Sequence, residues 1–169
     1  MKFEANMNKN LSSLMNLSNL NNIFQVIGAI GLIASLVFVG LELQQNQKIA
    51  LAKTQQERNN SIRNQITSYT IAGLDWQSIA IDSNDYYEYP LKEIAKRNAY
   101  HSAWFLYEND FFQYKQGLIS EDVWRAKVNA FKKWYDKCDM RYLFKVRSKW
   151  MPVAFRELIE SFPDNCVAP

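Results

Sequence analysis

The sequence is poor in the residues that make tight turns, cross-links and metal sites. Its 169 residues include five glycines, four prolines, two cysteines and one histidine. An all-β fold needs a turn between most of its strands, so this scarcity of glycine and proline weighs against one. A single histidine excludes a histidine-rich metal site. The composition therefore favours an all-α fold.

Cysteine usage and charge bear on the compartment and on possible partners. The two cysteines, Cys138 and Cys166, lie 28 residues apart and form no Cys-x-x-Cys motif. We expect them to be free thiols in a reducing compartment, because a secreted disulfide framework usually has more cysteines. The net charge of +3 is too small to imply nucleic acid as a partner.

A long stretch without any charged residue occupies the N-terminal part of the chain. No Asp, Glu, Lys or Arg occurs between Asn10 and Leu41, and residues 23–41 read IFQVIGAIGLIASLVFVGL. As a helix, this apolar run would be about 30 Å long, which matches the hydrocarbon thickness of a bilayer. We predict a transmembrane helix over residues 23–43.

Two other interpretations of this run compete with a membrane span. A secretory signal peptide has a basic start close to a shorter apolar region, whereas this run begins only after 22 residues. A core helix that is apolar all round needs a larger protein to cover it. We therefore favour the membrane span over both.

The basic residues near the span predict its orientation. Four of them follow the span and two precede it: Lys48, Lys53, Arg58 and Arg63 after it, and Lys2 and Lys9 before it. Since basic residues are enriched on the cytoplasmic side, this bias favours a cytoplasmic C-terminal part.

Residues 1–22 are rich in asparagine, and we expect them to be a polar, flexible N-terminus.

The rest of the chain predicts a helical stalk and a helical head. Residues 42–71 contain neither glycine nor proline, so the membrane helix should continue as a polar stalk. Nineteen of the 24 aromatic residues lie between Tyr86 and Phe162, as a small core requires. Gly117 should end one head helix in a left-handed conformation, and Ser120 should cap the next. The predicted segments are a stalk at 44–73, a connector at 74–90 with room for one short helix, a head at 91–162 and a tail at 163–169.

Three segments carry a resemblance to a known group. They are VIGAIGLIASLVFVGLELQQNQKIALAKTQQ, FFQYKQGLISEDVWRAKVNAFKKWYDK and RSKWMPVAFRELIESF. They resemble a widespread group of small uncharacterised bacterial proteins, and the resemblance covers about residues 26–162. This chain has Gln44 where that group usually has arginine. The resemblance implies one N-terminal membrane helix, a helical stalk and a head at the bacterial inner membrane, and it supplies no catalytic residue.

Small and polar residues repeat with heptad spacing along the span. We predict a helix interface formed by Gly28, Gly31, Ser35, Glu42 and Gln45. Small residues let two helix backbones approach in lipid, and a polar contact can add to the association. The alternative is that glycine is simply common in membrane helices and that Glu42 faces lipid headgroups.

Few residues suggest chemistry. His101 and Glu108 are seven residues apart and could share one helix face, but a structural histidine beside Tyr100 and Trp104 is the favoured interpretation. The sequence contains no phosphate-binding, nucleophile-elbow or di-iron motif. We therefore predict neither an enzyme nor a cofactor.

Residues 125–149 hold nine basic and two acidic residues, which we interpret as solvated helix faces, although anionic lipid or nucleic acid is a conceivable alternative.

These observations predict a membrane-anchored interaction or scaffold protein. Its span would associate laterally in lipid, and its head would bind a protein partner. The alternative is an accessory subunit of a larger integral-membrane complex, whose span packs on other subunits. An enzyme that uses His101 and Glu108 is a third and weaker hypothesis.

Overall fold

The protein is all-α, as the composition predicts. The computed structural model describes the backbone of residues 2–166 and the side-chain surroundings of residues 20–166. Every element within these residues is a helix. The chain divides into two compact units, Met1–Gln47 and Lys48–Pro169, and each is described by itself.

The first element is one continuous helix, α1 (Lys2–Ile71). It is long and apolar enough to span a membrane, with a mean hydropathy of 2.3 in its most apolar 18-residue window. Residues 2–22, for which a polar, flexible N-terminus was predicted, belong to this helix, and their flexibility stays a prediction. These residues contain no glycine or proline, and asparagine lowers helix propensity by only a fraction of a kcal/mol per residue.

The apolar part of α1 is uncovered. Its large apolar side chains between Leu20 and Leu43 are 49% to 67% exposed. Such a continuous apolar surface is far larger than the patches that soluble monomers usually show. It needs lipid or another helix around it.

The C-terminal part of α1 belongs to the second unit and is packed. Ala52, Asn59 and Ile66 are buried at intervals of seven residues. The helix α3 (Leu91–Lys115) packs against this part of α1, because Asn59 donates a hydrogen bond to the Phe105 carbonyl and Asn98 donates one to Thr70 Oγ1. These pairs show that α3 runs antiparallel to α1. The second half of the predicted stalk is therefore one wall of the head.

A tight elbow joins α1 to the head. Gly73 adopts φ = 71°, a left-handed conformation that favours glycine, and Leu74 N–H donates to the Tyr69 carbonyl at 2.8 Å. A Cβ at Gly73 would lie 3.0 Å from Leu91 Cδ2. The short helix α2 (Trp76–Ala80) follows, within the connector where one short helix was predicted.

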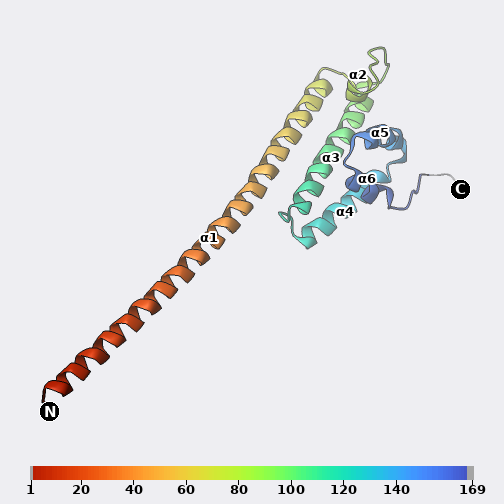
Figure 1. Cartoon of the computed structure of the whole chain (residues 1–169). Coiled ribbons are helices and arrows are strands. Elements are labelled where there is room, and N and C mark those ends of the chain that lie inside the picture. Colours follow the sequence, from red (N-terminus) through yellow and green to blue (C-terminus); the bar gives the residue numbers. More distant parts are fainter. Residues whose placement is uncertain (1, 167–169) are drawn as a thin grey trace. The chain divides into compact units, whose positions relative to one another are not determined.

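The remaining helices pack on the other side of α3 (Figure 1). They are α4 (Glu121–Tyr135), α5 (Arg141–Arg147) and α6 (Val153–Glu160), with short 3-10 turns η1 (Cys138–Met140) and η2 (Ser148–Trp150). Gly117 has φ = 75°, which confirms its predicted conformation. Ser120 precedes α4 but donates to Asp122 instead of capping the helix with its side chain.

Aromatic side chains form the core of the head. Trp104, Phe131 and Phe155 are completely buried. Phe131 and Phe155 meet edge to face, with ring centroids 5.7 Å apart, and Trp104 contacts Phe155 in the same manner at 6.3 Å. Edge-to-face pairs add stability beyond their buried area. The aromatic density of the sequence is thus explained by one small core shared by α3, α4 and α6.

Candidate functional site

The predicted helix interface lies on the exposed part of α1. Gly28 and Gly31 have open space where a Cβ would stand, and Ser35 Oγ donates to the Gly31 carbonyl at 2.9 Å. Glu42 and Gln45 are exposed. The serine hydroxyl proton is therefore used inside the helix, which leaves its oxygen as an acceptor. The interface remains a prediction, because within residues 20–166 these side chains contact no second helix.

The heptad register of this face continues into the packed part of α1. Gly31 and Gln45 fall on the same seven-residue repeat as Ala52, Asn59 and Ile66. In the second unit the last three positions are buried, and Asn59 is bound by α3. A partner helix along this register is therefore limited to the part of α1 that precedes Ala52.

Asp75 forms the centre of a polar cluster at the elbow. Its Oδ2 accepts hydrogen bonds from Ser78 N–H at 2.9 Å, from Ser78 Oγ at 2.6 Å and from Arg97 Nη2 at 3.0 Å. Its Oδ1 accepts from Arg97 Nε at 2.8 Å. Burial raises the pKa of Asp75, but the hydrogen bonds from Arg97 and Ser78 outweigh it and hold the pKa below its ordinary value. The carboxylate therefore caps α2 and anchors α3 at once.

Asn98 extends this polar cluster from α3 back to α1. Its Oδ1 accepts from Trp76 N–H at 2.8 Å, and its Nδ2 donates to Thr70 Oγ1 and to the Leu74 carbonyl, both at 2.9 Å. Asn98 is completely buried. Its acceptor and its amide donor are both used, so this cluster fixes the elbow and offers no open coordination for a ligand. Sequence reasoning missed it, because its members come from three segments with no shared motif.

His101 and Glu108 do not form the pair that the sequence allowed. His101 is completely buried, and neither ring nitrogen has a hydrogen-bond partner. Its ring packs 4.8 Å from that of Trp76. Burial, with a smaller effect of Arg147, lowers the pKa of His101 to about 3. A neutral imidazole without access to solvent is a poor proton shuttle. No group of three metal-binding side chains occurs among the described residues.

Glu108 instead pairs with Arg147 of α5. Arg147 Nη2 donates to Glu108 Oε1, and the two side chains are 5% and 16% exposed. Burial raises the pKa of Glu108 and lowers that of Arg147. The basic run 125–149 is thus only partly a solvated face. Arg147 and Arg141 are buried, whereas Lys133 and Lys145 are exposed.

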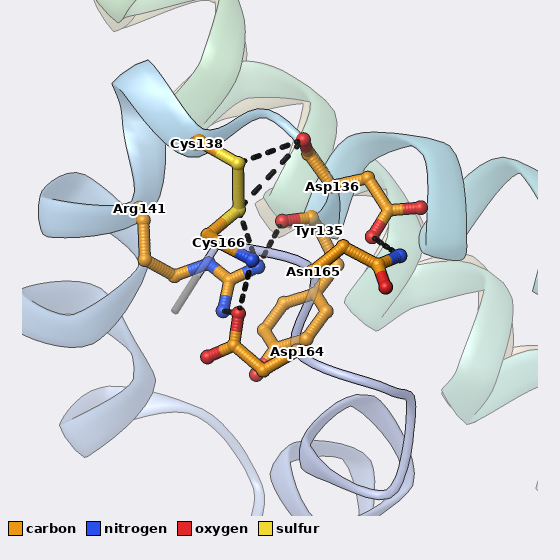
Figure 2. The surroundings of a disulfide bond; sticks show 7 residues. All are labelled: Tyr135, Asp136, Cys138, Arg141, Asp164, Asn165 and Cys166. Carbon is orange, nitrogen blue, oxygen red and sulfur yellow. Dashed lines mark hydrogen bonds and ion pairs between the residues drawn. A yellow bond between two sulfur atoms is a disulfide. The ribbon is translucent and has the colours of Figure 1, made fainter. Parts of the chain in front are cut away.

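The prediction of free thiols is wrong, because Cys138 and Cys166 form a disulfide (Figure 2). Their Cα atoms lie 5.1 Å apart. With the cysteines 28 residues apart, the sequence gives no local signal for this pairing. After α6, residues 163–166 pack against the turn that follows α4. No local sequence motif predicts this proximity.

Arg141 lies beneath the disulfide and ties the tail to the head (Figure 2). Its Nη1 lies 2.6 Å from Asp164 Oδ1, and its Nη2 donates to the Tyr135 carbonyl at 2.6 Å. The guanidinium stacks on the Tyr135 ring, 3.6 Å from the ring centroid. Residues 163–166 are therefore held by a covalent bond and by a buried cation, and they are part of the folded head, whereas the rest of the predicted tail lies outside the described residues.

Comparison of the chain with models of protein families, with curated proteins and with solved structures finds no match. The resemblance to the bacterial group described above therefore remains a prediction.

Proposed function

We propose that the chain is a single-pass membrane protein that acts as an interaction or scaffold protein. Its span would associate laterally in the membrane, and its head would bind a protein partner. The observation that supports this proposal is the uncovered apolar face of α1, whose large side chains between Leu20 and Leu43 are about half to two thirds exposed. Lipid covers such a face, and small residues on it allow close packing of a second helix.

The head has exposed aromatic and apolar side chains for a protein partner. Tyr142, Trp150 and Val153 are 61%, 76% and 57% exposed, and they follow one another from α5 to the start of α6. Tyrosine and tryptophan are enriched where protein partners bind. An accessory subunit of a larger membrane complex would use the same two surfaces, with the span packed on other subunits.

Purification of the full chain in a mild detergent separates these two functions. A scaffold that self-associates should elute as a single polypeptide with a mass that is a multiple of the monomer. An accessory subunit should elute with other chains at fixed stoichiometry. A lone monomer that retains no other chain, both in detergent and after crosslinking in membranes, would contradict both.

Two observations indicate on which side of a bacterial inner membrane the head lies, and they point in opposite directions. The Lys and Arg bias of four to two favours the cytoplasm. A structural disulfide persists in an oxidising compartment and is rare in the cytoplasm. The charge bias is small, whereas the disulfide is built into the packing of the tail. The proposal therefore has the head outside the cytoplasm, with the cytoplasmic head predicted from sequence as the alternative.

A further inference from the structure

A cavity of about 310 Å³ opens in the head beside α2. The volume lies at the lower end of the range for small-molecule sites. Its lining combines flat apolar side chains with one ion pair: Trp76 and Ile81 at α2, Phe105 and Glu108 on α3, Arg147 on α5, and Trp150 in η2. This combination of apolar walls with a few convergent polar groups is typical of ligand pockets.

If its role were purely structural, the ion pair in this cavity would contribute little stability for its desolvation cost. Arg147 and Glu108 have side chains that are only 5% and 16% exposed. A buried ion pair contributes little stability compared with apolar side chains of the same volume. In addition, Arg147 Nε is buried without a hydrogen-bond partner. An unpaired buried donor destabilises a fold unless something else binds it. The residues around Arg147 therefore leave one of its donors unused.

Glu108 offers the complementary group. Its Oε1 accepts the hydrogen bond from Arg147, and no other hydrogen bond to this carboxylate occurs within the described residues. Its second oxygen is therefore an available acceptor. The pair presents a donor and an acceptor beside each other, with formal charges that cancel. No other charged residue lines the cavity.

The walls select for a flat ring. Trp150 is 76% exposed, unusually so for a tryptophan, and it borders the cavity. Phe105 is fixed by the Arg147 guanidinium, which lies 3.5 Å from its ring centroid. Trp76 is fixed by its edge-to-face contact with Phe105, with centroids 5.7 Å apart. Two walls are thus packed against neighbouring side chains, and the exposed face of Trp150 is available to stack on a ligand.

We propose that this cavity binds a small neutral molecule with a flat ring and an adjacent hydrogen-bond donor and acceptor, as in an aromatic carboxamide or a lactam. The donor binds the free oxygen of Glu108, and the acceptor binds Arg147. A carboxylate ligand is repelled by Glu108, and an ammonium ligand is repelled by Arg147. The proposal rests on neither the span nor a protein partner, although the cavity shares Trp150 with the partner surface described above.

A matched series of three probes tests the charge preference. Benzamide, benzoate and benzylammonium share one phenyl ring and carry a neutral, an anionic and a cationic group, the last of them one methylene from the ring. Binding is measured by ligand-observed NMR on the full chain in lipid nanodiscs, with empty nanodiscs as the blank. Benzamide should bind with a dissociation constant of about 1 mM, as befits so few heavy atoms. Benzoate and benzylammonium should bind about tenfold more weakly or worse.

Variants locate the binding. Trp150→Ala should weaken benzamide binding about tenfold, while Tyr142→Ala, an exposed aromatic outside the cavity, should leave it unchanged. Glu108→Gln removes the negative charge and should make benzoate the preferred probe. If Glu108→Gln fails to fold, the comparison of Trp150→Ala with Tyr142→Ala tests the proposal by itself. Absence of benzamide binding, a preference of the wild type for either charged probe, or equal loss in both aromatic variants would overturn the proposal.

Discussion

Arg97 of α3 donates two hydrogen bonds to Asp75, which precedes it by 22 residues and caps α2. Their side chains are 10% and 0% exposed. The guanidinium also lies over the ring of Tyr89, 4.2 Å from its centroid. One ion pair thus joins α2, α3 and the connector, and it fixes the elbow at which the chain turns from α1 into the head.

Breaking this pair should strongly destabilise the head. Asp75→Asn leaves the Arg97 charge buried without its carboxylate, which typically costs about 3 to 5 kcal/mol. The matched control is Lys96→Ala, because the neighbouring Lys96 makes an exposed ion pair with Asp139 and should matter little. Chemical denaturation followed by tryptophan fluorescence measures both variants. Equal denaturation midpoints for Asp75→Asn and wild type would show that the elbow does not hold the head together.

His101 should make the head less stable in mild acid. Its pKa is lowered to about 3 in the folded protein from 6.5 in the unfolded chain. Between these values only the unfolded chain binds the proton, so the free energy of unfolding falls as pH falls through this window. The slope for this group is at most about 1.4 kcal/mol per pH unit.

His101→Leu keeps a similar volume and removes the titration. Its free energy of unfolding should depend less steeply on pH between 7 and 5 than that of the wild type. At pH 7 the variant should be at least as stable as the wild type, because leucine replaces a buried imidazole whose nitrogens make no hydrogen bonds. Denaturation curves at the two pH values measure the difference. Parallel pH profiles would mean that His101 titrates normally in the folded protein.

The sequence predicted the elements whose cause is local. The structure has an apolar helix in the uncharged run between Asn10 and Leu41, and a helix end at the left-handed Gly117. Both features depend on residues that are neighbours in the sequence. The disulfide between Cys138 and Cys166 and the bonds of Asp75 to Arg97 depend on how distant segments pack. No periodicity encodes such pairs, so sequence reasoning missed both.

The same distinction explains the outcome for the other predicted residues. Seven-residue spacing placed His101 and Glu108 on one helix, but the helices packed against α3 decided their surroundings. Trp76 contacts the imidazole, and Arg147 binds the carboxylate. The interface predicted at Gly28 and Gly31 involves a second helix, which the packing of one chain does not test.

Removal of the disulfide should destabilise the head. The bond closes a loop of 28 residues, which corresponds to about 3 to 4 kcal/mol from restricted unfolded-state entropy. Cys166→Ser should therefore lower the free energy of unfolding by about this amount, and a reductant should do the same to the wild type. The reductant should have no further effect on the variant. A wild type that is insensitive to reductant would show that the disulfide adds no stability.

Reporter fusions should show on which side of the membrane the head lies. Alkaline phosphatase, which needs an oxidising compartment to fold, should be active when it is fused after Pro169. It should be inactive when it is fused before Met1. The opposite pattern would support the cytoplasmic head that the Lys and Arg bias predicts, and it would contradict the orientation inferred from the disulfide.

The central claim, lateral association through the span, is tested most directly by chemical crosslinking in native membranes at matched expression. The double variant Gly31→Leu with Ser35→Leu fills the space that a partner helix would need. It should reduce the crosslinked fraction about fivefold, which corresponds to about 1 kcal/mol of helix association. The control Leu32→Ile with Val37→Leu changes other faces of the same helix and should crosslink like the wild type. Equal crosslinking of wild type and both double variants would contradict the claim.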